Sequence, residues 1–228
     1  MILFEYTKVS GWEAALRGMR NPMNSWDRSD TDFDGEAMVQ GMGINDHTLA
    51  QKLADAGQVH GKYLRMINVT VDITAPMYWW QEFDTNKVGT VRNSCSKMHK
   101  IHSKEFTLGD FSHENLLNTG YSEADMYQDL TPQDLLQMTV YSLNESRTLY
   151  LWAKEQNDKA RMKLYWWQMI QLLPASYNQR STVQMNYAVL KNIYPYRKDH
   201  KLDEWQDFCI WIERLPYAEL ITGKGNEQ

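Results

Sequence analysis

An alternating run of apolar and polar residues between Lys62 and Ile73 is the feature that most constrains the fold of this chain. A period of two with β-branched residues at its end is typical of a half-buried β-strand, and we expect one here. Ala75-Pro76 should break this strand, and the aromatic run that follows over residues 77–83 resembles the start of a helix. Residues 2–9 also alternate, which predicts an opening strand.

Most of the remaining chain carries helix signals. Thr131-Pro132-Gln133-Asp134 combines a capping Thr, a Pro at the first helical position and an acid in the first turn, and a helical period follows to Glu155. Further helices are predicted over residues 48–56, 160–172, 179–194 and 202–215. Asp46 or Thr48 would cap the first of these, and Pro174 and Pro195 would end the second and third. Residues 21–35 and 87–114 read as polar loops, the second with a short helix. The pattern predicts an α+β domain over residues 1–222 with a polar tail at 223–228.

The composition of the chain argues against several classes of protein. With 228 residues, 43% of them hydrophobic, the chain can bury a full core. No apolar run approaches the roughly eighteen residues of a membrane span, and the N-terminus carries no signal-peptide pattern. Two cysteines give no disulfide framework, so we expect a cytoplasmic protein. A net charge of -5 argues against a protein that binds duplex nucleic acid.

Common catalytic motifs are missing from the sequence. It has no Gly-rich phosphate loop, no Gly-x-Ser-x-Gly and no His-Glu-x-x-His. His99 and His102 could share a helical face as metal ligands, but no third ligand is in register, so we expect no metal site. Cys95 lacks a base partner. Nine Trp and thirteen Tyr could stack on flat ligand rings, although a core or a subunit interface explains such residues more often.

Two carboxamides and an arginine, namely Asn186, Asn192 and Arg197, follow Leu173-Pro174 on a predicted helix and its exit. An Asn side chain can hydrogen-bond to ring edges and carbonyls, and an Arg side chain can make two parallel hydrogen bonds to phosphate or carboxylate oxygens. This set suits a phosphorylated, base-bearing ligand. The alternative is that these residues are an ordinary solvated helix surface.

These spacings resemble those of the flavin-dependent thymidylate synthases. In that family a histidine opens a strand that ends near Ala-Pro, as His60 and Ala75-Pro76 do here, and a short helix leads into an Arg-His-Arg-x-x-Ser signature. The family also has a Leu-Pro, an Asn twelve residues past the Pro, a second Asn six further on and an Arg five beyond that. Leu173-Pro174, Asn186, Asn192 and Arg197 reproduce this block without a gap, and the resemblance covers about residues 57–98 and 165–205.

The chain departs from the family at the signature itself. Arg-His-Arg-x-x-Ser falls on residues 85–90, where Lys87 keeps a cation and Thr90 a hydroxyl while Thr85 and Asn86 lose a guanidinium and an imidazole. The family's next serine and arginine fall near Cys95 and Lys97, with Ser94 and Ser96 adjacent, and Ile170 replaces an arginine before Leu-Pro. Because Lys cannot make Arg's bidentate fork, anion binding should be reduced or rebuilt.

The resemblance implies a helix-rich α+β domain around a small, mostly antiparallel sheet, assembled as a homotetramer whose sites form between subunits. It implies FAD as cofactor, NADPH as reductant, and transfer of a methylene from methylenetetrahydrofolate to C5 of dUMP. The cofactor-binding residues would be His60, Lys87, Thr90, Asn186 and Asn192. The nucleotide-binding residues would be Gln81, Ser94, Ser96, Lys97 and Arg197, and Arg197 would also be catalytic.

Three functions stay open at this point. The first is an active flavin enzyme that methylates a pyrimidine nucleotide. The second is a catalytically altered homologue that binds or sequesters a nucleotide without redox chemistry, as the altered signature allows. The third is a helix-rich oligomer with no small ligand, which the aromatic content alone would permit.

Overall fold

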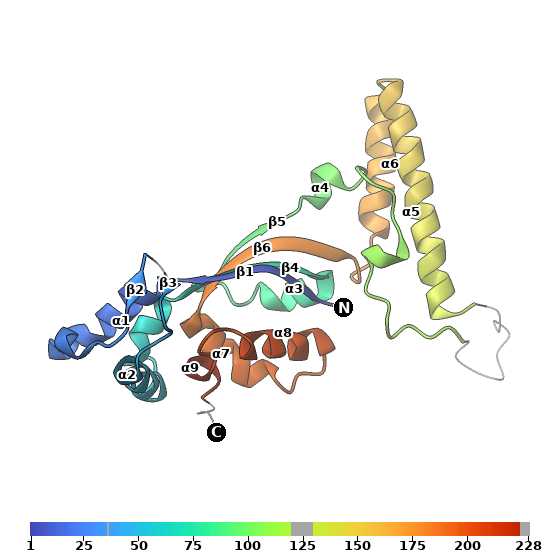
Figure 1. Ribbon diagram of the computed structural model, residues 1–228. Helices are drawn as coiled ribbons and strands as arrows, with labels where there is room; N and C mark the ends of the chain where they lie inside the picture. Colours follow the sequence, from blue (N-terminus) through green and yellow to red (C-terminus); the bar gives the residue numbers. More distant parts are fainter. Residues whose placement is uncertain (36, 120–129, 224–228) are drawn as a thin grey trace. The chain divides into compact units, whose positions relative to one another are not determined.

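The computed structural model describes residues 1–35, 37–119 and 130–223, and these fall into two compact units (Figure 1). Unit 1 comprises Met1 and residues 74–82 and 94–180, and unit 2 comprises residues 2–73, 83–93 and 181 onward. The expectation of a single domain over residues 1–222 stays a prediction. Of the expected polar tail, residues 224–228 lie outside the described residues.

A four-stranded antiparallel sheet contains the strands in the order β1-β4-β6-β5. These strands are β1 (Leu3–Ser10), β4 (Asn68–Pro76), β6 (Asn178–Asn186) and β5 (Val91–Ser94). Strands β2 (Phe33–Asp34) and β3 (Ala37–Met38) pair with each other and form a second, two-stranded antiparallel sheet. The strand expected at residues 2–9 is confirmed. β5 was not expected, because its sequence Val-Arg-Asn-Ser is polar and largely exposed.

The strand expected over residues 62–73 is confirmed only in its second half. Residues Gly61–Arg65 form the short 3₁₀ helix η3, and β4 begins at Asn68. From there alternate residues are buried, with Val69, Val71 and Ile73 fully covered. Ala75-Pro76 does not break the strand but forms its last two residues. The aromatic helix after it is confirmed as α3 (Met77–Phe83).

Residues 179–194, expected as one helix, are instead the end of a strand and the start of a helix. In β6 the buried positions alternate at Gln179, Ser181, Val183 and Met185. The first two are polar, so only Val183 and Met185 show the alternation of apolar residues that marks a strand in a sequence. Ser181 Oγ accepts a hydrogen bond from Arg92 Nε at 3.0 Å, which satisfies this buried hydroxyl. The helix α7 begins at Tyr187 and runs to Arg197, so Pro195 lies inside it rather than ending it.

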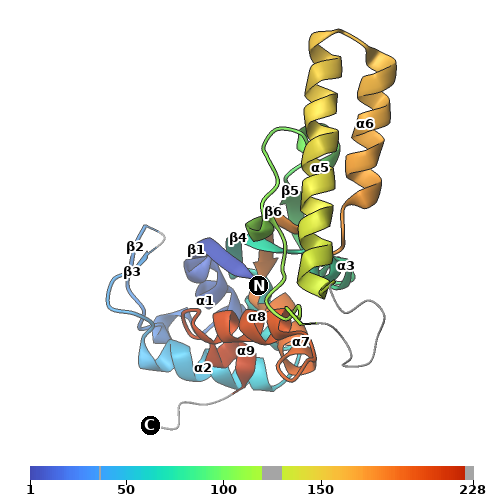
Figure 2. The same cartoon turned by 90° about the vertical axis from the view of Figure 1, so that its right-hand side faces the viewer.

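Unit 1 contains a long helical hairpin. Helices α5 (Pro132–Glu155) and α6 (Lys159–Leu172) lie side by side in both views (Figures 1 and 2), with α4 (Lys97–Lys100) and the 3₁₀ helix η4 (Leu108–Asp110) earlier in the unit. The expected start of α5 is confirmed, since the Thr131 hydroxyl and the Asp134 carboxylate each accept a hydrogen bond from the other's backbone N–H. Buried apolar residues at the base of the hairpin form its core, including Phe111, Leu143 and Met169.

Unit 2 packs its helices around an aromatic core. These helices are α1 (Trp12–Arg20), α2 (Ile44–Asp55), α7 (Tyr187–Arg197), α8 (Asp203–Glu213) and α9 (Glu219–Thr222), with the 3₁₀ turns η1 (Asn21–Met23) and η2 (Trp26–Arg28). Phe83, Trp205 and Phe208 are fully buried, with ring centroids 5.5 to 6.3 Å apart. The amphipathic helix expected over residues 202–215 is confirmed as α8.

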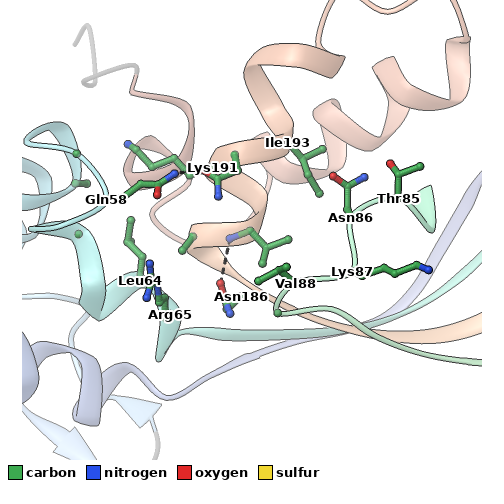
Figure 3. A pocket seen from close by; sticks show the side chains of 17 residues that line it. Gln58, Leu64, Arg65, Thr85, Asn86, Lys87, Val88, Asn186, Lys191 and Ile193 are labelled. Carbon is green, nitrogen blue, oxygen red and sulfur yellow. Dashed lines mark hydrogen bonds between the residues drawn. The ribbon is translucent and has the colours of Figure 1, made fainter. Parts of the chain in front are cut away.

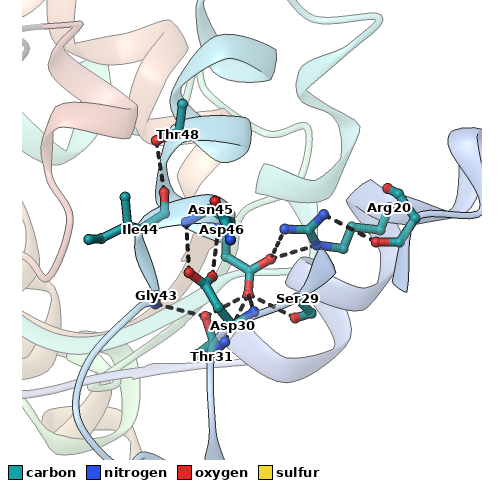
Figure 4. A network of polar contacts seen from close by, with 10 residues as sticks. Arg20, Ser29, Asp30, Thr31, Gly43, Ile44, Asn45, Asp46 and Thr48 are labelled. Carbon is teal, nitrogen blue, oxygen red and sulfur yellow. Dashed lines mark hydrogen bonds and ion pairs between the residues drawn. The ribbon is translucent and has the colours of Figure 1, made fainter. Parts of the chain in front are cut away.

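A buried ion pair fixes the loop before α2 (Figure 4). Arg20 is 3% exposed and Asp46 is fully buried, and Arg20 Nε donates to Asp46 Oδ1 at 2.6 Å. The other oxygen of Asp46 accepts hydrogen bonds from the Ser29 hydroxyl at 2.8 Å and the Thr31 hydroxyl at 2.7 Å. The expected cap at Asp46 or Thr48 is wrong, because α2 begins at Ile44 and Asp30 accepts from the first-turn N–H groups of Asn45 and Asp46.

The surroundings of Asp46 lower the pKa of its carboxyl. Burial alone would raise the pKa of this carboxyl, but hydrogen bonds from Thr31, Ser29 and Arg20, together with the charge of Arg20, outweigh it and lower the pKa below 3.8. A carboxylate with a lowered pKa contributes stability above its unfolded pKa and loses it as the pH falls through the folded pKa.

We predict that Asp46→Asn destabilises the protein by about 3–5 kcal/mol, because it leaves the buried Arg20 guanidinium without its counter-charge. Urea denaturation followed by circular dichroism measures this change. The matched control is Asp27→Asn, which removes the same charge from an exposed position nearby and should change stability by less than about 0.5 kcal/mol.

Comparing the wild type with Asp46→Asn at several pH values gives a second test. The stability advantage of the wild type over Asp46→Asn should hold near neutral pH and shrink as the pH falls below about 4, because an unfolded chain begins to protonate its Asp residues there while the lowered pKa keeps Asp46 charged in the folded protein. An advantage that stays constant down to pH 2 would show that the Asp46 charge contributes nothing.

Candidate functional site

A cavity of about 660 Å³ lies in unit 2, between the end of α2, η3, the loop after α3 and the first turns of α7 (Figure 3). Its wall includes Gln58, Arg65, residues 85–89, Asn186, residues 188–189 and residues 191–193. Segments more than a hundred residues apart in the sequence therefore supply one site.

Asn186 sits where β6 becomes α7. Its Oδ1 accepts a hydrogen bond from Val189 N at 3.0 Å, so this side chain caps the helix. The next backbone N–H, that of Tyr187, donates to Ile67 O at 3.0 Å and ties the helix start to the residue before β4. Asn186 lines the cavity, and its amide nitrogen, a hydrogen-bond donor, is not used by the cap.

Gly89 lets the loop after α3 approach this helix start. Its φ is +75°, and a Cβ on this residue would lie 2.9 Å from Val189 Cγ2 and 3.3 Å from Asn186 Nδ2. Only glycine fits both the backbone conformation and the contact. Gly89 therefore helps to hold residues 85–89 in the cavity wall.

The cavity is basic in an acidic chain. Arg65, Lys87 and Lys191 line it, and its described lining residues include no Asp or Glu. Burial lowers the pKa of Lys191, an effect that Asp55 partly offsets, and its Nζ donates to Leu220 O at 3.1 Å. Figure 3 shows Lys87 extending away from Asn186, toward the side of Thr85. Three cations without a lining carboxylate suit an anionic ligand.

The structure brings three of the five expected cofactor residues into this wall. Lys87, Asn186 and Asn192 line the cavity, and Asn192 Oδ1 accepts from Gln58 Nε2 at 3.0 Å. His60 and Thr90 do not line it: His60 precedes η3, and Thr90 follows the lining residue Gly89. The Thr90 hydroxyl is buried and finds no hydrogen-bond partner within the described part of the chain.

Two of the expected nucleotide residues line a separate cavity of about 430 Å³, within unit 1. These are Ser96 and Lys97; Gln81 and Ser94 are exposed and are not among its lining residues. The Ser96 hydroxyl caps α4 by accepting from His99 N at 3.2 Å.

Arg197 lines neither cavity. It is the last residue of α7 rather than a residue past a helix end, because the helix continues through Pro195. Its guanidinium carbon lies 4.3 Å from the centre of the Trp205 ring, a cation–π contact.

Sequence reasoning missed Arg65, Lys191 and Gln58. Arg65 fell within the expected strand, and Lys191 fell within a helix whose start was placed too early. No signal in the sequence marks Gln58. Within residues 1–35, 37–119 and 130–223, no cluster of three or more His, Cys, Asp or Glu side chains could hold a metal ion. A search of the same residues finds no helix with the length and apolar character of a membrane span.

Comparison with known proteins finds no match by sequence but finds several similar structures. No protein-family model matches the sequence, and no curated protein matches it. Among solved structures, thymidylate synthase X from Helicobacter pylori with FAD and dUMP is similar at a TM-score of 0.61 and 18% identity, over 97% of both chains. A second Helicobacter pylori structure, of flavin-dependent thymidylate synthase complexed with FAD and dUMP, has a TM-score of 0.62 and 18% identity, over 97% of this chain and 98% of that one.

A UMP/dUMP methylase, PolB from Streptomyces cacaoi bound with 5-Br dUMP, is similar at a TM-score of 0.60 and 15% identity. The match covers 99% of this chain and 96% of that one. The expected fold class is confirmed, and the resemblance read from the motifs holds at the level of the fold: this chain has the fold of the flavin-dependent thymidylate synthases.

Proposed function

We propose that this protein is a divergent flavin-dependent thymidylate synthase that binds FAD and methylates a pyrimidine nucleotide at C5, converting dUMP to dTMP or carrying out a related alkylation. The observation that carries the proposal is the unit 2 cavity. Lys87, Asn186 and Asn192, which the family resemblance implies as cofactor residues, line one basic cavity in a chain with this fold.

The cavity residues fit a flavin nucleotide. A volume of about 660 Å³ is within the usual range of ligand sites. The cations can balance a pyrophosphate, and the carboxamides of Asn186 and Asn192 can hydrogen-bond to ring edges and carbonyls. Thr85 and Asn86 lack the charge of the family signature, and Arg65 and Lys191 supply cations from other elements.

The assigned chemistry needs no cysteine nucleophile. Bound FAD would supply the redox chemistry, with NADPH as reductant and methylenetetrahydrofolate as one-carbon donor. The protein then has to bind, orient and shield its ligands, and the residues of the cavity are of the types that do so.

We predict that Asn186→Ser weakens FAD binding roughly three- to tenfold, as expected for the loss of one neutral hydrogen bond. Serine caps helices as well as asparagine does, so the fold should be retained while the amide donor is lost. Fluorescence titration of the apoprotein with FAD measures the dissociation constant.

A charge-matched pair of variants completes this test. Lys87→Gln should weaken FAD binding and reduce its salt dependence, whereas Lys62→Gln removes the same charge from an exposed residue outside the cavity wall and should have little effect. If purified protein carries no flavin and added FAD does not bind in the titration, the proposed function is wrong.

We predict that Arg197→Ala weakens nucleotide binding roughly tenfold to a hundredfold, because a charge-assisted contact to phosphate or an imide edge is lost. In the family arrangement this arginine would act in a site shared between subunits, which would explain why it lines neither cavity of its own chain. Loss of the Trp205 contact should cost only about 0.5–1 kcal/mol of stability. Calorimetric titration with dUMP and an assay of dTMP formation give the two readouts; unchanged values for a folded variant would remove Arg197 from the site.

We also propose that the protein is a homotetramer. Large apolar side chains are exposed on the α5–α6 hairpin, including Tyr141, Trp152, Leu164 and Trp167. Light scattering should give four times the chain mass of 26.9 kDa. Leu164→Glu should lower that mass, whereas Met23→Glu, at an exposed position of unit 2, should not. A single-chain mass for the wild type at micromolar concentration would refute the tetramer.

A further inference from the structure

An ion pair joins the two ends of residues 84–92, the loop of unit 2 that carries part of the cavity wall. Arg92 Nη1 donates to Asp84 Oδ2 at 2.6 Å. The same guanidinium donates from Nε to the buried Ser181 hydroxyl on β6 at 3.0 Å. A planar guanidinium can serve two acceptors at once, because its N–H groups point in fixed directions. Arg92 therefore ties the base of the loop together and ties it to β6.

The loop has one buried anchor and one close approach to α7. Phe83, the residue before the loop, is buried in the aromatic core, and its carbonyl accepts from Asn86 N at 2.9 Å. Farther along, Thr90 N donates to Lys87 O at 3.4 Å, and Gly89 comes close to the first turn of α7. Lys87 lies between these two points.

Little within the loop itself would preserve this arrangement. Four of the six residues 85–90 are exposed and the other two are half-buried. Gly89 adds backbone freedom to any open form of the loop. A segment with so few buried contacts opens readily, and joining its ends restricts the conformations that it can reach. The contacts of Arg92 are therefore placed to keep the loop closed.

We propose that Arg92 is a positioning residue of the unit 2 cavity, whose contacts with Asp84 and Ser181 keep residues 85–89 in the wall and Lys87 available to an anionic cofactor. Arg92 is not among the residues that line the cavity, so it acts through the loop. Lys87 is the one charged residue between positions 85 and 90, which makes its placement decisive. The inference rests on the proposed function and adds a residue that the family resemblance does not assign.

Hydrogen exchange tests this positioning in the flavin-free full-length protein. Arg92→Gln should accelerate amide exchange of residues 85–90 roughly threefold or more, because the loop opens more often. Arg17→Gln is the matched control and should leave that exchange unchanged. Arg17 also pairs with a carboxylate of unit 2, that of Glu13 at 3.3 Å, but its side chain is 66% exposed against 17% for Arg92.

FAD affinity tests the consequence for the cavity. Arg92→Gln should weaken FAD binding roughly three- to tenfold, the factor expected if the wall-forming arrangement falls to about a third to a tenth of the population. Arg92→Lys should lie between this variant and the wild type, because lysine keeps the charge but lacks the fork that reaches both acceptors. Asp84→Asn should act in the same direction, and it takes the place of Arg92→Gln if circular dichroism shows that variant to be unfolded.

A double-mutant cycle separates positioning from direct contact with the cofactor. If Arg92 acts by holding Lys87 in place, Lys87→Gln should cost less FAD affinity in the Arg92→Gln background than in the wild type. In the Arg17→Gln background, Lys87→Gln should cost as much as it does in the wild type.

Two results would overturn the inference: unchanged exchange of residues 85–90 in Arg92→Gln, or an equal effect of Lys87→Gln on FAD affinity with and without Arg92. The outcome is separate from that of the proposed function. Faster exchange in Arg92→Gln of a protein that never binds FAD would support the positioning role and refute the flavin enzyme. FAD binding with unchanged exchange would do the reverse.

Discussion

The change from strand to helix at Asn186 is the local constraint on which the unit 2 cavity depends. One side-chain oxygen caps α7, and the following N–H is bonded to Ile67 O, so the helix can start in only one place. Gly89 then allows the loop after α3 to pack against that start. The three segments are distant in sequence, and their meeting at this corner gathers Lys87, Asn186 and Asn192 into one wall.

Charge is distributed unevenly over this protein. The chain as a whole is acidic, yet the charged residues that line the two cavities are mainly lysine and arginine. Lys87 and Lys97 fall at or near positions of family arginines, whereas the other cations of the two cavities come from elsewhere in the chain. Arg65 and Lys191 come from η3 and α7, and Lys100 and Arg180 come from α4 and β6. Loss of a signature arginine therefore does not remove positive charge from a site, because charge acts through space and any neighbouring element can supply it.

Elements with strong local signals were predicted well, and those that depend on distant partners were not. The cap and first turn of α5 could be read from four residues, since all of the hydrogen bonds involved lie within them. The start of α2 could not, because its capping carboxylate is Asp30, fourteen residues before the first helical residue. The sequence predicts a helix over most of β6, because two buried positions of this strand, Gln179 and Ser181, are polar and bond to partners on other segments.

The sequence by itself determined the α+β class, the aromatic α3, the helices α5 and α6, and the spacing of Pro174, Asn186, Asn192 and Arg197 that points to the family fold. Those features are local or are fixed intervals along the chain. Only the tertiary structure decided that Lys87, Asn186 and Asn192 share a cavity while Ser96 and Lys97 belong to another, and that Arg65, Lys191, Lys100 and Arg180 complete them. The physical reason is that a binding site is a set of distances between side chains, and those distances are set by strand pairing, caps and close packing rather than by position in the sequence.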